Sequence, residues 1–401
     1  MEKGHDIDTM VDFDTLVERR KDTSAKWQVI HDEMGDGCDD VLALSVADME
    51  FPTCPAVTEA IINSAKHDIL GYDHIPDEYY DALGSWMGKH HHLEVKPEQV
   101  TTTAGVMPAV LAALRAITHP GDKVILQRPV YYPFTHAAEY AGLTILDNEL
   151  VRDSNGHYSI DFEDLTSKAA DPRCKAMLVC NPHNPVGRVW TRDELTRMAD
   201  ICLSNDVTIL ADEIHADFSY DGHEVTMMSN LSDEVAQHCM EFTAPTKTFN
   251  LAGLACSNAI IKNTSLKRDF DIAVANAGGL TVNHFGYVAC QAAYEHGEAW
   301  LDDLRKYLAK NLSIVRDFAD SQHDISLIEP EGTYLAWLDC NGLGMNNEEL
   351  KNFMRTKARI FMDEGCMFGA SGSGFERVNM ACPASFLSEA MERIAVAVAV
   401  R

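Results

Sequence analysis

The hydrophobic positions of this chain follow two patterns, short apolar runs that are typical of buried strands and spaced apolar positions that are typical of helices. The run Ala-Met-Leu-Val-Cys at 176–180 has no polar face, so it predicts a strand that is covered on both sides. By this pattern or by alternation, strands are predicted at 41–46, 99–105, 123–127, 143–146, 176–180, 207–211, 257–261, 333–338 and 375–381.

Helical patterns alternate with many of these strands. After the strand at 99–105, apolar residues recur on one face of a helix that opens at Val106. Strands that alternate with helices predict a doubly wound α/β sheet. Further helices are predicted at 12–20, 55–67, 285–321, 347–359 and 386–400.

The chain length and the order of the patterns indicate more than one domain. Its 401 residues are enough for one large core and a smaller domain. We expect an N-terminal arm at 1–48 that joins the small domain, a large domain at 49–285 and a small α+β domain at 286–401. The sequence contains no internal repeat and no low-complexity segment that would change this division.

Charge and composition narrow the classes of function. The formal net charge of −29 argues against nucleic acid or an anionic membrane as a partner, because both require a basic face. The 11 cysteines include no Cys-x-x-Cys pair, so neither a zinc ribbon nor a disulfide scaffold is indicated. Residues 1–6 lack a signal-peptide pattern, and no apolar run reaches the roughly 20 residues that cross a bilayer. We therefore expect a cytoplasmic enzyme.

Three consecutive histidines, His90 to His92, raise the question of a metal site. Consecutive side chains point in different directions on a helix, and no acidic or cysteine partner stands at ligand spacing. We therefore interpret the run as a solvated face and expect no metal.

The candidate chemistry centres on Lys247, within the stretch 243–253. Hydroxyl side chains flank this lysine, and Phe249, Leu251 and a small-residue turn follow it. Partial burial lowers the pKa of a lysine and frees its nitrogen lone pair for Schiff-base chemistry. An ordinary loop lysine is the alternative on this stretch alone, because most lysines are exposed.

Polar residues stand where predicted strands end. Gly105 and Val106 form a strand-to-helix turn, whose free N–H groups can hold a phosphate, although such turns are common. The sequence Asn-Pro-His-Asn-Pro-Val-Gly at 181–187 predicts a rigid extended loop. Asp212 ends the strand at 207–211, where a carboxylate is costly unless it is paired. Arg377 is suited to bind a carboxylate, with a surface ion pair as the equal alternative.

Three of these segments, 181–187, 211–215 and 247–253, stand in the order of the fold-type I pyridoxal 5′-phosphate (PLP) enzymes, the aminotransferase class I/II superfamily. Asp-Glu-Ile-His and Lys-Thr-Phe-Asn-Leu-Ala-Gly, in the second and third segments, resemble its cystathionine β-lyase (C–S lyase) branch. The resemblance runs from about residue 13 to residue 396. It implies a large PLP-binding domain with a mixed, mostly parallel sheet, a smaller α+β domain, and a homodimer whose active sites lie at the subunit interface.

The resemblance assigns roles to matching positions. Lys247 would bind PLP and act as the general base, Asp212 would pair with the protonated pyridine nitrogen, and Arg377 would bind the substrate carboxylate. Asn184 matches the donor to the cofactor's phenolic oxygen, and Tyr131 matches the aromatic ring that stacks on the pyridine. The positions implied to bind the cofactor are Tyr72, Gly105, Val106, Met107, Tyr131, Asn184, Asp212, His215, Thr246 and Lys247.

Two positions depart from the patterns of related enzymes. His215 stands near the phenolic oxygen where aspartate-type aminotransferases carry a tyrosine, a feature of the lyase branch. Ala244 replaces a serine that usually binds the phosphate, so we expect the phosphate to depend on the amides of 105–107, on the Thr246 hydroxyl and on Tyr72 from the neighbouring subunit. A surface turn is the alternative for Tyr72. Core filling is the alternative for Tyr131, and it is our preferred interpretation of Trp27 over a substrate contact.

The implied reaction is α,β-elimination of L-cystathionine or a related sulfur amino acid to pyruvate, ammonia and a thiol. An aminotransferase with the same site residues is the first alternative. Its aspartate-type form is disfavoured, because 278–284 lacks an arginine for a second carboxylate. A PLP-binding regulator that acts through protein contacts is the second alternative.

Overall fold

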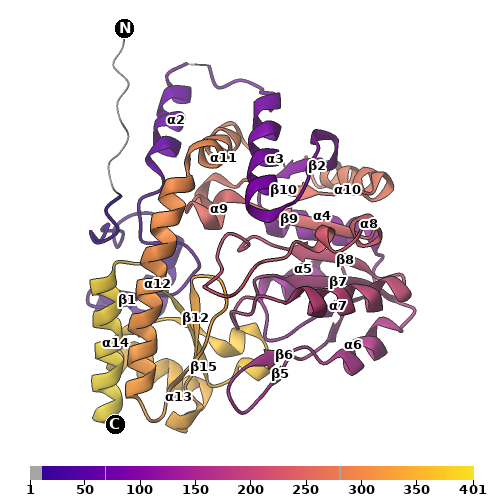
Figure 1. Ribbon diagram of the computed structural model, residues 1–401. Helices are drawn as coiled ribbons and strands as arrows, with labels where there is room; N and C mark the ends of the chain where they lie inside the picture. The colour runs from indigo at the N-terminus through magenta and orange to yellow at the C-terminus, as the bar shows by residue number, and fades with distance from the viewer. Residues whose placement is uncertain (1–10, 68, 280) are drawn as a thin grey trace.

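A computed structural model describes residues 11–67, 69–279 and 281–401, and its largest sheet forms the centre of the molecule (Figure 1). The strand order is β2-β10-β9-β8-β7-β3-β4, in which β10 is antiparallel to both neighbours and the other adjacent pairs are parallel. This mixed, mostly parallel sheet confirms the α/β class. Its strands are β2 (Val100–Thr103), β3 (Lys123–Leu126), β4 (Thr144–Asp147), β7 (Cys174–Cys180), β8 (Thr208–Asp212), β9 (Cys239–Thr243) and β10 (Ser257–Ile260). Residues 1–6, the subject of the signal-peptide prediction, lie outside the described residues.

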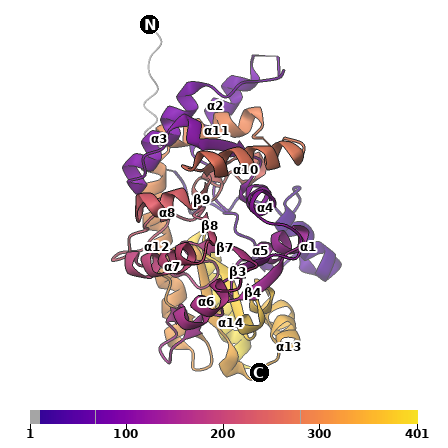
Figure 2. The same cartoon turned by 90° about the vertical axis from the view of Figure 1, so that its right-hand side faces the viewer.

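Helices cover both faces of this sheet, as Figure 2 shows, because successive strand side chains point to opposite faces and both sets are apolar. Val124 and Leu126 pack with α4, α5 and α10, whereas Ile125 packs with α6 and α7. The helices concerned are α4 (Val106–Ile117), α5 (Pro133–Tyr140), α6 (Phe162–Ala169), α7 (Arg192–Ser204), α8 (Asp233–Gln237) and α10 (Thr264–Asn276).

A second core lies beside the sheet, above it in Figure 1. It is built by α2 (Pro55–Ala65), α3 (Asp77–His91), α11 (His284–His296) and the first turns of α12 (Glu298–Ser321). Phe249, from the stretch around Lys247, is fully buried in this core. The segment that carries the lysine is therefore packed against helices as well as against the sheet.

The C-terminal part forms an antiparallel sheet with the order β11-β12-β15-β14. Helices α12 and α14 pack on it, and β1 of the N-terminal arm pairs with β13, so the arm is attached to this part of the molecule. The division at 48/49 and 285/286 stays our proposal. The remaining elements are α1 (Ala25–Met34), α9 (Pro245–Thr248), α13 (Asn347–Asn352), α14 (Ala384–Ala399), β1 (Leu42–Ala43), β5 (Val151–Arg152), β6 (Tyr158–Ser159), β11 (Ser326–Ile328), β12 (Leu335–Asp339), β13 (Ile360–Phe361), β14 (Asp363–Glu364) and β15 (Phe375–Asn379).

The helix predicted at 12–20 is wrong, since those residues form bends and turns and the first described helix is α1. The side chain of Asp12 accepts hydrogen bonds from the backbone N–H of Asp14 and Thr15, at 2.8 and 3.0 Å. Such a local bond competes with helical hydrogen bonding. Phe13 still contributes to the core, so the apolar pattern here indicated a buried side chain but did not indicate a helix.

The helical pattern predicted at 285–321 is divided into α11 and α12, which meet at Gly297. A Cβ atom at Gly297 would lie 2.3 Å from the ring of Phe249 and 2.5 Å from the carbonyl oxygen of Ala293. Glycine therefore permits the close approach of this turn to the lysine segment. Among the helices of the described residues, none combines the length and apolar character that a bilayer crossing requires.

The strand β9 was not predicted, although it lies inside the central sheet and leads directly to Lys247. Glu241 interrupts its apolar run, and this carboxyl group is fully buried and accepts a hydrogen bond from Ser229 N at 2.7 Å. A charged residue is rare in a buried central strand, so the interrupted hydrophobic pattern did not predict β9.

Two side-chain predictions have different outcomes. Trp27 is 5% exposed and packs with Ile30 and Val41, which confirms that it is a core anchor. The solvated face predicted for His90 to His92 is wrong for His91, which is buried and lies 2.9 Å from Asp217.

Candidate active site

One cavity of about 230 Å³ collects most of the residues predicted to bind a cofactor. It opens where β7 and β8 end and where α4 begins, at the carboxyl edge of the parallel strands, the usual ligand position in such sheets. Arg377 and Tyr72 are not in its lining. The predicted residues that line it are Gly105, Val106, Met107, Tyr131, Asn184, Asp212, His215, Thr246 and Lys247.

A larger hollow of about 830 Å³ lies between α2, α11 and the start of α12. Its lining includes Glu59, Glu295 and Trp300, together with small apolar side chains, but none of the residues predicted for the cofactor. The chemistry therefore places the site in the smaller cavity.

Lys247 lies on α9, a single helical turn that follows β9. Its Nζ donates a hydrogen bond to the carbonyl oxygen of Ala47 at 2.6 Å. Burial lowers the pKa of this amine to about 8, with a further lowering from the Arg377 charge and an opposing influence from Asp48. A substantial fraction of the amine is therefore neutral near physiological pH, as a nucleophile requires. An ordinary solvated lysine does not fit this position.

Asp212 ends β8, opposite Cys180 of β7, and is 4% exposed. Burial raises the pKa of its carboxyl group to about 7, and the N–H of Ile214, 3.1 Å from Oδ1, and the Lys247 charge oppose that rise. A carboxylate in such a setting is stabilised when a cationic group is placed against it. The site therefore offers an acceptor for a positively charged ring nitrogen.

His215 and Tyr131 present uncharged aromatic side chains. Burial, Lys247 and Arg377 hold the pKa of His215 well below its usual value, so its imidazole is neutral, and its Nδ1 has no hydrogen-bond partner in the part of the chain that the structure describes. Burial raises the pKa of Tyr131 to about 12, and its backbone N–H donates to the Asn184 carbonyl at 3.0 Å. An orphaned, buried imidazole nitrogen indicates that a further polar group belongs in the cavity.

Arg377 lies behind the cavity and is 3% exposed, so the alternative of a surface ion pair is wrong. Its Nη1 donates to Asn184 Oδ1 at 2.9 Å and its Nη2 to Asp363 Oδ2 at 2.5 Å, while its Nε has no partner among the described residues. The guanidinium group is thus pre-oriented by two side chains and keeps N–H donors, including that of Nε, for a ligand. Such a group is suited to bind a carboxylate that enters beside Asn184.

The N-terminus of α4 lines one end of the cavity. Gly105 precedes the helix with φ of 130°, a conformation that side-chain-bearing residues rarely adopt. The first N–H groups of α4 have no partner within the helix and carry its positive dipole end. Ala244 is buried and is not in the cavity lining, whereas Thr246 lines the cavity. Tyr72 is fully exposed on the loop after α2.

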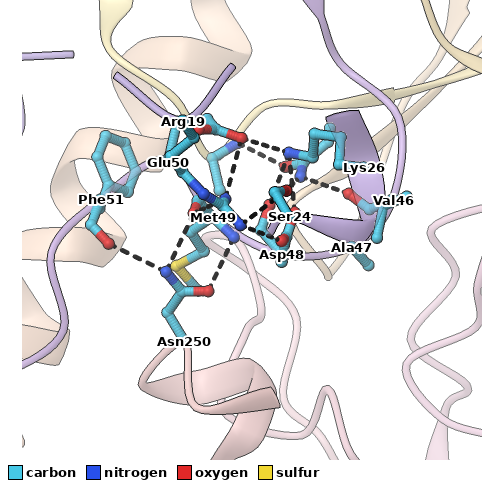
Figure 3. A network of polar contacts seen from close by, with 12 residues as sticks. Arg19, Ser24, Lys26, Val46, Ala47, Asp48, Met49, Glu50, Phe51 and Asn250 are labelled. Atoms are coloured by element: carbon cyan, nitrogen blue, oxygen red, sulfur yellow. Dashed lines mark hydrogen bonds and ion pairs between the residues drawn. The ribbon is translucent and has the colours of Figure 1, made fainter. Parts of the chain in front are cut away.

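Asn250 was not predicted as a site residue, although it binds the segment 46–51, whose Ala47 lines the cavity. Figure 3 shows that Asn250, three residues after Lys247, reaches the segment 46–51. Its side chain accepts from Met49 N at 2.9 Å and donates to the carbonyls of Met49 and Phe51, both at 3.0 Å. These bonds fix the segment that carries the Ala47 carbonyl beside the Lys247 amine. The sequence contains this residue in Lys-Thr-Phe-Asn, but its partners Met49 and Phe51 are 201 and 199 residues away.

A buried ion cluster joins Asp48 and Glu50 of this segment to Arg19 and Lys26, as Figure 3 shows. Lys26 is 1% exposed and lies 2.6 Å from Glu50 and 2.9 Å from Asp48. Burial alone would lower the pKa of Lys26, but Glu50 and Asp48 raise it above its usual value. Arg19 adds ion pairs to both carboxylates. Lys26 is therefore a structural cation and not a second reactive amine.

The residues present fit PLP as a cofactor. The cavity combines a partly neutral lysine amine, a buried carboxylate without a cation in contact, a helix N-terminus for a phosphate and an unpartnered imidazole nitrogen. Lys247, Asp212 and the first turn of α4 would hold the aldehyde carbon, the ring nitrogen and the phosphate, respectively.

Comparisons with known proteins agree with this chemistry. The chain matches the family "Aminotransferase class I and II" over residues 39–394. Cystathionine β-lyase PatB of Bacillus subtilis (strain 168) is 38% identical over 390 residues, which cover 96% of this chain and 100% of that protein. Protein MalY of Escherichia coli (strain K12) is 31% identical over 383 residues, which cover 95% and 97%. The crystal structure of cystalysin from Treponema denticola, which contains PLP, has a TM-score of 0.95 at 39% identity and covers 98% of this chain and 100% of that chain.

The fold and the site thus define a PLP-dependent enzyme of fold type I. The chain belongs to the aminotransferase class I and II family and, within it, to the carbon–sulfur lyase branch. PLP is its cofactor, as the sequence predicted.

Proposed function

We propose that the protein catalyses α,β-elimination of L-cystathionine or a related sulfur amino acid to pyruvate, ammonia and a thiol. The observation that carries this proposal is the meeting of a buried Lys247, whose pKa is about 8, with Asp212 in one cavity. The choice of substrate class is supported by the relatives, since PatB is named a cystathionine β-lyase. His215 supports the lyase over an aspartate-type aminotransferase, whose pattern has a tyrosine at that place.

When bound, PLP withdraws electrons from the α-carbon of an amino acid attached to it. In our proposal the amine of Lys247 would hold the cofactor and, once free, would remove the α-proton of the substrate. The Ala47 carbonyl, 2.6 Å from Nζ, holds the freed amine at the cavity wall. Asp212 would pair with the ring nitrogen of the cofactor and so support its withdrawal of electrons.

Other residues would orient the reactants. Arg377 would bind the substrate carboxylate through the donors that Asn184 and Asp363 orient. Asn184 would also donate through its amide to the phenolic oxygen of the cofactor, and Tyr131 would cover the ring. The amides of 105–107 and the Thr246 hydroxyl would bind the phosphate.

We further propose a cytoplasmic homodimer in which Tyr72 completes the phosphate site of the partner subunit. Tyr72, Leu70 and Ile69 are 112%, 63% and 83% exposed, and Ile62 at the end of α2 is 50% exposed. Apolar side chains that gather at one exposed place indicate a surface that another protein covers. Size measurement in solution tests the dimer, and loss of PLP affinity in Tyr72→Phe tests the role of the hydroxyl.

The reaction type is tested by the products. With L-cystathionine as the only substrate, we expect equal amounts of pyruvate, ammonia and homocysteine, with no requirement for a 2-oxo acid. A sulfur leaving group on the β-carbon would favour elimination over transamination, so transamination should be slow. Turnover that depends on 2-oxoglutarate and yields glutamate would instead identify an aminotransferase. Binding of a protein partner without any turnover would favour the regulator.

Arg377→Ala is expected to raise KM for every amino-acid substrate by roughly 10- to 150-fold, which corresponds to 1.5–3 kcal/mol for a lost charge-assisted hydrogen bond. PLP affinity should change little, because Arg377 does not line the cavity. Arg316→Ala is the control, since it removes an exposed ion pair with Glu329. Steady-state kinetics with several substrates measure the effect, and an unchanged KM would remove Arg377 from the substrate site.

A further inference from the structure

The helix that carries Lys247 has little stability of its own. α9 comprises four residues, and its N-cap residue Ala244 makes no side-chain cap. A single helical turn is unstable without tertiary contacts. The position of the Lys247 amine must therefore be set by neighbours of the lysine, and Thr248 makes a buried polar contact with Asp217.

That contact is made with Asp217, whose carboxylate is 7% exposed and serves several elements at once. Thr248 Oγ1 donates to Asp217 Oδ2 at 2.5 Å. On the other oxygen, Trp86 Nε1 lies at 3.2 Å and His91 Nε2 at 2.9 Å, both from α3. Arg305 of α12 donates through Nε to the Asp217 carbonyl at 2.8 Å. The carboxylate thus joins α9 to α3, and its backbone is tied to α12.

Asp217 also belongs to the turn that carries the ring-nitrogen partner. This turn begins at Asp212 and includes His215, and two backbone bonds close it, from Ala216 N to Glu213 O and from Phe218 N to His215 O, both at 2.9 Å. A displacement of Asp217 would therefore move Asp212 and His215 as one piece.

The charge of Asp217 is maintained by its donors. Burial raises the pKa of its carboxyl group, but the hydrogen bonds and charges of His91, with help from Thr248 and Arg305, bring that pKa below its usual value. An anionic acceptor makes shorter and stronger hydrogen bonds than a neutral one. The Thr248 hydroxyl is thus held by a permanent charge.

We propose that Asp217 is a positioning residue, which fixes the Lys247 helix relative to the turn of Asp212 and His215 through its hydrogen bond with Thr248. This inference rests on the proposed function of Lys247. A rigid cofactor held from two sides requires a constant separation between the two holders, and a displacement of about 1 Å can lower a rate by about 10²-fold. The buried His91 anchors the same carboxylate to α3, which gives the histidine run a role without a metal.

The test uses the holoenzyme and the variants Thr248→Val and Thr248→Ser. Valine has nearly the shape of threonine but no donor, so we expect kcat to fall by about tenfold or more while KM changes less than about twofold. The absorption band of the bound cofactor should shift, because the bond between Lys247 and the cofactor would be strained. Serine restores the hydroxyl and should recover kcat to within about threefold of the wild type.

Thr101→Val is the matched control. Thr101 on β2 donates to Asp271 Oδ1 at 2.5 Å, so the same type of bond is lost at the same distance, away from the cavity. We expect this variant to lose thermal stability but to keep kcat and the cofactor absorption band. If Thr248→Val and Thr101→Val had the same kcat, serine would have no loss to restore. That result would overturn the positioning role of Asp217.

A second variant keeps the inference testable if Thr248→Val does not fold. Asp217→Asn retains the shape but removes the charge, and we expect it to show the same fall in kcat at unchanged KM. Wild-type kcat in Asp217→Asn would also overturn the inference. Failure of the proposed function would give different results. Lys247→Ala would still hold PLP through a bond that borohydride reduces, or the wild type would release no pyruvate.

Discussion

Replacing Lys247 with alanine is expected to lower turnover by about 10⁴-fold or more and to leave the fold intact. The variant loses the amine that would attach PLP and also the general base, a role that alone contributes 10²- to 10⁴-fold. Among the described residues, no other lysine lines the cavity, and nearby Lys26 is neutralised by Asp48 and Glu50. The Ala47 carbonyl keeps its hydrogen bond from the Tyr334 hydroxyl at 3.0 Å, so no buried acceptor is left unpaired.

The measurement combines pyruvate release, thermal unfolding and reduction with borohydride. Wild-type protein should retain a covalent link to PLP after reduction, whereas Lys247→Ala should not. Lys247→Arg serves as a second variant, because it keeps a positive charge near the cavity but has no amine to form the link. A Lys247→Ala protein with both turnover and a reducible link would show that another residue attaches the cofactor.

Replacing Asp212 with asparagine should have the second-largest effect, a fall in kcat of roughly 10²- to 10³-fold, the range for removing one group that stabilises developing charge. The neutral amide cannot keep the ring nitrogen of PLP protonated, so less negative charge is withdrawn from the α-carbon. The affinity of the substrate should change much less, since Arg377 and Asn184 are retained. Steady-state kinetics separate the two effects, and an unchanged kcat would exclude the role of Asp212.

For the protein without cofactor, we expect Asp212→Asn to raise the stability of the fold. Burial raises the pKa of Asp212 from 3.8 to about 7, so ionisation of this group destabilises the folded apoprotein as the pH rises between those values. The full penalty is present above about pH 7 and corresponds to at most about 4 kcal/mol. Asp212→Asn apoprotein should therefore unfold at a higher temperature than wild type at pH 8, and the difference should vanish near pH 4. A pH-independent difference would contradict the assignment.

Residues at the ends of strands could be predicted from the sequence, because their signals are local. The apolar runs that became β3, β7 and β8 are buried on both faces, and such runs have few alternatives in a folded chain. Asp212 follows one of these runs directly, and Asn184 follows another within a loop restricted by proline. The carboxyl ends of neighbouring parallel strands meet at one edge, which is why Asp212 and Asn184 line one cavity.

Other features depended on partners far away in the chain. The charge pattern of α3 gave no indication that His91 would be buried, because its partner Asp217 is 126 residues distant. Glu241 concealed β9 for a similar reason, since a carboxyl group enters a central strand only where the fold supplies donors such as Ser229 N. The prediction of a helix at 12–20 was wrong because the Asp12 side chain accepts hydrogen bonds from the backbone N–H groups of Asp14 and Thr15, which compete with helical hydrogen bonds.

The sequence by itself determined which residue types follow which strands, and hence the lysine, the carboxylate and the helix N-terminus that we propose bind PLP. Only the tertiary structure decided their chemical state. The pKa of Lys247 is lowered to about 8, and that of Asp212 is raised to about 7, by burial among segments that are distant in the chain. The same packing placed Ala47 against the lysine and Asp217 against its neighbour Thr248. Desolvation and hydrogen-bond partners depend on three-dimensional neighbours, which no local pattern records.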